Sequence, residues 1–337
     1  MLTSSILLIL LILGIYAYLL SSPKLPANTD EIIQDVLDAD TVEQITGDTG
    51  FADSDGVSIW YNHIPAVGDK RGAIILVMGH STNIFGWPDY LIDVLLGAGY
   101  DVIRYDNRGI GMSDWVKRWS VESAYSLEDM AKDCIAILDH LKLDKVHLVG
   151  ASMGGMIAQR LAISYGQRFH TLTSIMSSGF MADPKLTLVP APFKRGMSKI
   201  LGRYGWRPTE KNSIKIGISL VRLLRNNKSH RVDAKDIAQK MKYDMRERKG
   251  FNRRVLKQHN KAIELSGSRY DELGSIAIPT LVIHGKRDPL VKIEHAHKYA
   301  PMIPHVKTLY LDKMGHDLPR ELNEDISRAI LSLISGS

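Results

Sequence analysis

The chain of 337 residues contains a single cysteine, Cys134, so no disulfide bond can form within it. Because Cys134 lies on the apolar side of a predicted helix, we expect a buried structural thiol. The sequence also lacks clustered metal-ligating residues and a glycine-rich phosphate loop, so we expect neither a metal nor a cofactor. Its hydrophobic content of 45% excludes a largely disordered chain and allows a large core.

Charge is absent from residues 2–20, LTSSILLILLILGIYAYLL. As a helix, this segment would span roughly 28 Å, close to the hydrocarbon thickness of a bilayer. We therefore expect residues 1–22 to be a single-pass membrane anchor, with the side of the membrane left open. A cleaved signal peptide is the alternative, although no basic segment precedes the apolar run and no clear cleavage site follows it. A polar linker is expected over residues 23–44, where Pro23 and Pro26 end the helix.

Acidic residues are scarce between Met181 and Leu265, where 22 Lys and Arg accompany 7 Asp and Glu. This segment has a net charge of +15, against −9 for the rest of the chain, and the asymmetry predicts an anionic partner. We expect no nucleic acid, because no zinc-finger spacing or other nucleic-acid module accompanies the charge. Beside a membrane anchor, an anionic lipid surface is the favoured partner, and a basic surface that only faces water is the alternative.

Short apolar runs alternate with helical segments and predict a mainly parallel sheet that is buried on both faces. One intervening helix begins after Ser126, which forms a capping-box pattern with Asp129 and precedes apolar residues at helical spacing. Between residues 180 and 265 the alternation stops and basic, helix-favouring sequence replaces it. The predicted strands are residues 57–64, 73–78, 101–106, 146–150, 172–178, 280–285 and 306–312.

Ser152 lies in the pattern Gly150-x-Ser152-x-Gly154, at the junction of an apolar run and a predicted helix. This spacing is typical of a nucleophile elbow, a tight strand-to-helix turn that exposes a hydroxyl above a sheet. A neutral hydroxyl is a weak nucleophile, so it needs a base and a group that orients the base. The candidates are His316, in KMGHD, and Asp288, in IHGKRDPLV, because each follows a predicted strand.

A serine nucleophile also needs donors for the oxyanion that forms on the substrate, and two backbone N–H groups suffice. One is expected from Met153, directly after the serine. The other is expected from His80 in GHSTNIFGW, with Gly79 and Ser81 as open alternatives. We expect the His80 side chain to line the pocket, and a role as a second acid or base is the alternative.

The stretch YDNRGIGMSD, residues 105–114, resembles the Asp-x-Arg-Gly-x-Gly-x-Ser signature of the alpha/beta-hydrolase superfamily. With the elbow and the chain order serine, aspartate, histidine, it makes the chain similar to that superfamily from about residue 45 onward. Residues 76–114 look particularly like its methylesterase and carboxylesterase branches, in which Met-Gly replaces the more usual His-Gly. Serine at the elbow argues against the dehalogenase and epoxide hydrolase branches, which use a carboxylate there.

The resemblance implies an eight-stranded, mainly parallel sheet flanked by helices, formed by residues 45–179 and 266–337. It also implies that the basic segment, residues 180–265, is a helical lid inserted after the sixth strand. The function implied is that of a serine hydrolase that cleaves a carboxylic ester, lipid-like or small, through an acyl-enzyme. The alternatives are a peptidase of the proline-iminopeptidase type and a non-catalytic member that binds a small ligand.

Overall fold

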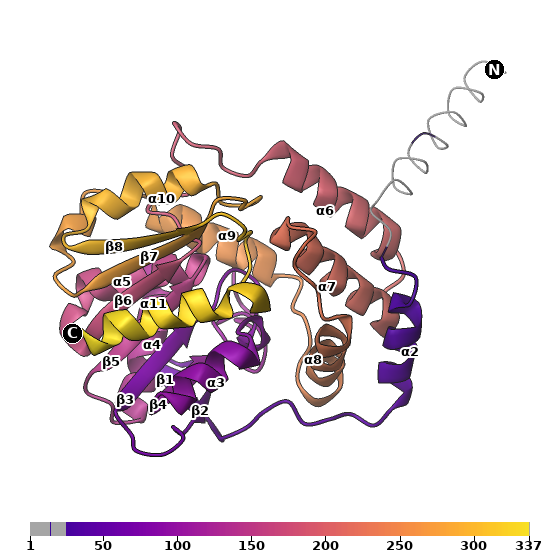
Figure 1. Cartoon of the computed structure of the whole chain (residues 1–337), viewed down its shortest axis with the longest axis horizontal. Helices are drawn as coiled ribbons and strands as arrows, with labels where there is room; N and C mark the ends of the chain where they lie inside the picture. Colours follow the sequence, from indigo (N-terminus) through magenta and orange to yellow (C-terminus); the bar gives the residue numbers. More distant parts are fainter. Residues whose placement is uncertain (1–13, 15–24, 337) are drawn as a thin grey trace.

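The computed structural model describes Gly14 and residues 25–336, and its centre is one eight-stranded sheet (Figure 1). The strand order is β1-β2-β4-β3-β5-β6-β7-β8, in which β2 is antiparallel to both neighbours and the remaining pairs are parallel. The strands are β1 (Asp48–Ser54), β2 (Val57–Ile64), β3 (Gly72–Val77), β4 (Tyr100–Tyr105), β5 (Val146–Ala151), β6 (Phe169–Ile175), β7 (Thr280–Gly285) and β8 (Val306–Leu311).

The predicted mainly parallel sheet is confirmed, since each apolar run overlaps one of the strands β2 to β8. Strand β1 was not predicted, because its sequence DTGFADS is mostly polar and carries no apolar run. It lies at the edge of the sheet, where it pairs only with β2 and exposes much of its surface. An edge strand of this kind depends on its hairpin partner more than on its own composition.

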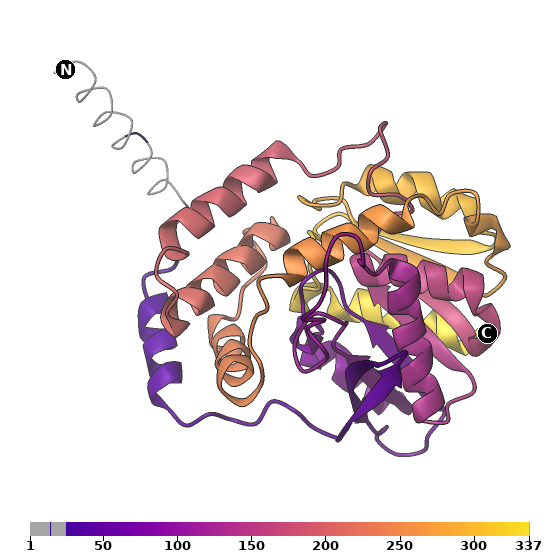
Figure 2. The ribbon, with the colours of Figure 1, turned by 180° about the vertical axis from the view of Figure 1, so that it is seen from behind.

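Helices cover both faces of the sheet, as the two opposite views show (Figures 1 and 2). Helices α4, α5 and α10 pack on one face, and α3 and α11 pack on the other. The helices are α2 (Thr29–Asp38), α3 (Asp89–Gly97), α4 (Leu127–His140), α5 (Met153–Ser164), α6 (Ala191–Tyr204), α7 (Glu210–Arg225), α8 (Ala234–Glu247), α9 (Val255–Ser266), α10 (Ile293–Tyr299) and α11 (Asn323–Ser335).

Helix α4 begins where the capping box predicts. The Ser126 Oγ accepts a hydrogen bond from the Asp129 N–H at 3.3 Å, and an Asp129 carboxylate oxygen accepts one from the Ser126 N–H at 2.9 Å. The apolar stripe of α4 packs on the sheet, and Cys134 is fully buried within it. Burial raises the pKa of the Cys134 thiol, so this residue is an uncharged part of the core, as expected.

Residues 29–38, which the sequence places in a polar linker, form helix α2 instead. Its apolar residues Ile33 and Val36 are buried in a small cluster with Ile214 and Ile218 of α7. The Nζ of Lys242 on α8 donates a hydrogen bond to the Val36 carbonyl at 2.9 Å, near the end of α2 where carbonyls lack helical partners. Helix α2 therefore lies against α7 and α8, beside the lid (Figure 1).

The predicted helical insertion after β6 is confirmed: residues 180–265 contain α6, α7, α8 and most of α9. Arg248 follows α8 directly and is almost fully buried, with its guanidinium paired to the Asp106 carboxylate of the sheet core. The same guanidinium lies 3.5 Å from the Asp244 carboxylate and 4.6 Å from the centre of the Trp60 ring. A lid arginine thus occupies a buried site beside β2 and the end of β4.

Neighbouring basic residues of the lid also bind the protein itself. The Lys249 Nζ donates to the Met112 carbonyl at 2.7 Å, and an Arg254 Nη donates to the Lys117 carbonyl at 3.2 Å. Arg246 forms an ion pair with Glu210, 2.8 Å away. The dense basic stretch therefore docks the lid onto the loop that follows β4, and the lipid contact expected for it is not supported.

The predicted membrane localisation is also corrected. Within Gly14 and residues 25–336, no helix is both long enough and apolar enough to cross a bilayer. The anchor expected over residues 1–22 lies, apart from Gly14, outside the residues that the structure describes.

We expect Arg248→Met to lower the free energy of unfolding by about 3 kcal/mol, because it leaves the buried Asp106 carboxylate without its cation. Urea unfolding followed by circular dichroism measures the change. Arg253→Met is the matched control, since Arg253 is exposed in the same stretch and should change stability by less than about 0.5 kcal/mol. Equal effects of the two substitutions would show that the Asp106–Arg248 pair does not hold the lid.

Candidate active site

Ser152 lies in the tight turn between β5 and α5, with φ +56° and ψ −121°. Such a backbone is strained for a residue other than glycine and needs support from its surroundings. That support comes partly from β6 and the residues after it: the Ser152 N–H donates to the Ile175 carbonyl at 2.9 Å, and the Ser177 Oγ donates to the Ser152 carbonyl at 2.8 Å. The turn holds the serine at the end of the strand.

Two glycines of the turn are required by close packing. A Cβ on Gly154 would lie 1.9 Å from the Val77 carbonyl oxygen, and a Cβ on Gly150 would lie 2.3 Å from the Gly154 carbonyl oxygen. Both distances are far below van der Waals contact, so no larger residue fits without moving the backbone. The glycines thus let the first turn of α5 pack directly against the ends of β3 and β5.

The structure brings together the three residues that the sequence nominates as nucleophile, base and orienting acid. The Ser152 Oγ lies 3.0 Å from the His316 Nε2, and the His316 Nδ1 lies 2.6 Å from an Asp288 carboxylate oxygen. The other Asp288 oxygen accepts hydrogen bonds from the N–H groups of Leu290 and Val291, each at 2.8 Å. His316 and Asp288 are buried, whereas Ser152 is partly exposed, so the serine is the member open to a ligand.

The loop that carries His316 is also held by the lid, and the sequence does not predict this contact. The His316 N–H donates to the Leu224 carbonyl at the end of α7, 2.8 Å away. One residue on, Arg225 pairs with Asp317 at 2.5 Å. The Asn226 side chain donates to the carbonyl of Arg287, the residue before Asp288, at 2.8 Å. The end of α7 therefore contacts both loops that supply the base and the acid.

The loop that contains His80 lies directly against the serine. A Cβ built on Gly79 would be 2.9 Å from the Ser152 Cβ, so the two backbones are in close contact. Among the residues that the structure describes, the backbone N–H groups of His80 and Met153 donate no hydrogen bond to another protein atom. Both remain available for a ligand next to Ser152. The His80 ring is turned toward Ser81, whose Oγ lies 2.9 Å from the His80 Nδ1, and burial lowers the pKa of His80.

His259 also contacts this loop, and the sequence analysis does not predict it. It belongs to α9 and is fully buried, and its Nδ1 accepts a hydrogen bond from the Ser81 N–H at 3.0 Å. Its Nε2 donates to the Arg108 carbonyl at 2.9 Å. No short-range motif could indicate this contact, because 178 residues separate His259 from Ser81.

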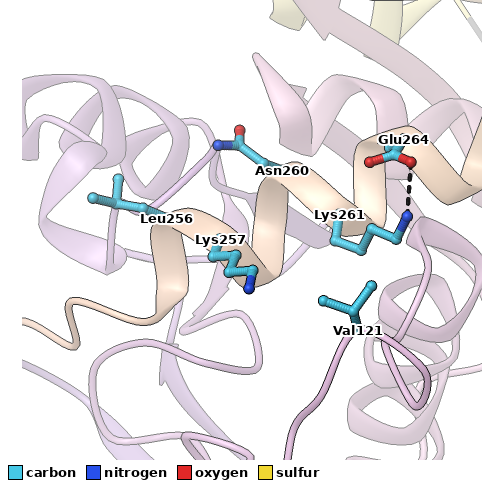
Figure 3. A pocket seen from close by; sticks show the side chains of 6 residues that line it. All are labelled: Val121, Leu256, Lys257, Asn260, Lys261 and Glu264. Atoms are coloured by element: carbon cyan, nitrogen blue, oxygen red, sulfur yellow. Dashed lines mark hydrogen bonds and ion pairs between the residues drawn. The ribbon is translucent and has the colours of Figure 1, made fainter.

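A surface cavity of about 480 Å³ lies beside α9, bordered by the loop that carries Val121 (Figure 3). Its lining includes none of Ser152, Asp288 and His316, and its Lys261 is already paired with Glu264 at 2.7 Å. We therefore do not assign it to the candidate active site. Across the described residues, no group of three or more His, Cys, Asp or Glu side chains is placed to hold a metal ion.

Comparison with known proteins places the chain in a family. Residues 72–319 match the family model described as alpha/beta hydrolase fold. The rhodomycin D methylesterase DauP of Streptomyces sp. strain C5 is 27% identical over 290 residues, which cover 82% of this chain and 94% of the relative. A 2-hydroxy-6-oxononadienedioate/2-hydroxy-6-oxononatrienedioate hydrolase of Klebsiella pneumoniae is 28% identical over 239 residues, covering 69% of this chain and 76% of the relative.

Solved structures agree with this assignment at the level of the fold. The crystal structure of a hydrolase from Pseudomonas aeruginosa PA01 superposes with a TM-score of 0.64 and 23% sequence identity. The match covers 86% of this chain and 99% of that one. Since the family model spans far more than half of the chain, the protein belongs to the alpha/beta hydrolase fold family and is a hydrolase of that fold.

Proposed function

We propose that this protein is a serine hydrolase that cleaves a carboxylic ester through an acyl-enzyme formed on Ser152. The observation that carries the proposal is the hydrogen-bonded chain from Ser152 through His316 to Asp288, with distances of 3.0 and 2.6 Å. This is the arrangement that converts a neutral hydroxyl into a nucleophile. Similarity to a methylesterase over 82% of the chain supports an ester as the bond that is cleaved.

In the first step, the Ser152 Oγ bonds to the ester carbonyl carbon while its proton passes to the His316 Nε2. Asp288 accepts the Nδ1–H of His316 and stabilises the imidazolium. The carbonyl oxygen becomes an oxyanion that accepts hydrogen bonds from the N–H groups of His80 and Met153, the two donors left free beside the serine.

The tetrahedral intermediate then loses its alcohol. The bond to the alkoxy oxygen breaks, His316 returns the proton to that oxygen, and the acyl group stays on Ser152. In the second half, His316 takes a proton from a water molecule whose oxygen bonds to the acyl carbon. The Ser152–acyl bond breaks, the proton returns to the Oγ, and a carboxylic acid leaves.

We expect Ser152→Ala and His316→Ala to lower kcat for ester hydrolysis by several orders of magnitude. The first removes the group that bonds to the substrate, and the second removes the group that transfers the proton. Asp288→Asn should also be severe, since the imidazole loses the acceptor that orients it. Hydrolysis of p-nitrophenyl butyrate and labelling by a fluorophosphonate measure the losses. Ser123→Ala, at an exposed serine away from the site, is the control. A fully active Ser152→Ala enzyme would refute the mechanism.

A substrate panel tests the bond class. Methyl and p-nitrophenyl esters should be hydrolysed with a kcat/KM at least tenfold above that for a proline p-nitroanilide with a free amine. Their kcat/KM should also exceed that for a 2-hydroxy-6-oxo-dienoate, the kind of compound that the Klebsiella relative's name contains. Preference for the anilide or the dienoate would replace the ester assignment. A wild-type protein that fluorophosphonate leaves unlabelled would instead indicate a non-catalytic member of the family.

A further inference from the structure

His259 connects the lid to two loops of the hydrolase core. Its Nδ1 accepts from the Ser81 N–H at 3.0 Å, and its Nε2 lies 2.9 Å from the Arg108 carbonyl oxygen. A backbone N–H can only donate and a carbonyl oxygen can only accept. The two bonds therefore require a neutral ring that carries its proton on Nε2, and they can form together only in that tautomer.

The Ser81 N–H lies within a tight turn. The Thr82 N–H donates to the Gly79 carbonyl at 3.4 Å, which encloses His80 and Ser81 as the central residues. Ser81 has φ +54°, a left-handed conformation that residues other than glycine adopt rarely. The peptide that carries the Ser81 N–H is the central peptide of this turn. The hydrogen bond to His259 fixes the direction of this central peptide.

The neighbouring peptide is joined to this one at the His80 Cα. The peptides on either side of the His80 Cα are those of the Ser81 N–H, held by His259, and of the His80 N–H, which is free beside Ser152. Gly79 already touches the serine, since a Cβ there would lie 2.9 Å from the Ser152 Cβ. On this side Gly79 leaves no room for a larger residue. An oxyanion donor is most effective when its direction is fixed before the reaction.

We propose that His259 is a positioning residue for the oxyanion loop: by holding the Ser81 N–H, it keeps the His80 N–H directed at the oxyanion. The inference rests on the proposed function, because it assumes that Ser152 forms an oxyanion there. His259 touches no reacting atom and acts through Ser81 and His80. Since it belongs to α9, the lid supplies part of the support for the catalytic loop.

The required neutral ring predicts a pH dependence of stability. Burial lowers the pKa of His259 to about 3, below the ordinary value of 6.5, and the rings that face it are those of His80 and Tyr125. The unfolded chain binds a proton below pH 6.5 while the folded chain does not, so this contribution to stability is lost as pH falls from 6.5 toward 3. Between pH 7 and 4, the unfolding temperature of His259→Asn should fall less than that of the wild type. Parallel curves would contradict the neutral ring.

Two substitutions separate the hydrogen bonds of His259. Asparagine places an acceptor near the position of Nδ1 and retains the bond to Ser81, whereas glutamine reaches the position of Nε2 and retains the bond to Arg108. We expect His259→Gln to lower kcat for p-nitrophenyl butyrate and the rate of fluorophosphonate labelling at least tenfold, with KM changed less than about twofold. His259→Asn should stay within about threefold of the wild type. Unfolding temperatures of both variants show whether a difference in folding explains the result.

The outcomes distinguish this inference from the proposed function. If the wild type is labelled and Ser152→Ala is not, the serine mechanism stands. Equal rates for folded His259→Gln and His259→Asn then overturn only the role of His259. If His259→Gln does not fold, His259→Leu takes its place, because leucine fills space without accepting a hydrogen bond. If folded His259→Leu is labelled by fluorophosphonate as fast as the wild type, the proposal is overturned. A tenfold loss of labelling rate would support it.

Discussion

The close approach of three backbones around Ser152 is the constraint on which the site depends. Gly154 packs against the end of β3 so tightly that a Cβ would lie 1.9 Å from the Val77 carbonyl oxygen. This contact draws the first turn of α5 beside the loop that follows β3, where Gly79 approaches the serine. The strained backbone of Ser152, of the kind that costs roughly 1–3 kcal/mol, persists because buried strands on both sides hold it.

Part of the lid's basic charge is used in contacts within the molecule. A lid of +15 lies on a core and termini of −9, and its densest basic stretch meets carboxylates and carbonyls of that core. Burying Arg248 against Asp106 adds little net stability, because desolvation of both charges offsets most of their attraction. The pair instead fixes where the lid lies, since an unpaired charge in either position is unfavourable. A composition signal that predicts an external partner can thus be satisfied by another part of the same chain.

Much of the fold and the proximity of Ser152, Asp288 and His316 could be predicted, because buried strands and a glycine-flanked serine leave local patterns. The same reasoning failed where an element depends on distant partners. Strand β1 has no apolar run and forms by pairing with β2, and α2 is helical because Ile33 and Val36 meet apolar residues of the lid. The support from Leu224 and His259 was missed for the same reason, since each contact joins segments that are far apart in the sequence.

These long-range contacts make the lid a part of the candidate site. The Leu224 carbonyl holds the N–H of His316, and the His259 ring holds the N–H of Ser81, so α7 and α9 reach the site from two directions. A displacement of the whole lid would break both hydrogen bonds and would also separate Arg248 from Asp106. Each of these losses leaves a buried polar group without a partner, which makes such a displacement costly. The geometry around Ser152 is therefore maintained jointly by the sheet, through its glycines, and by the lid, through its hydrogen bonds.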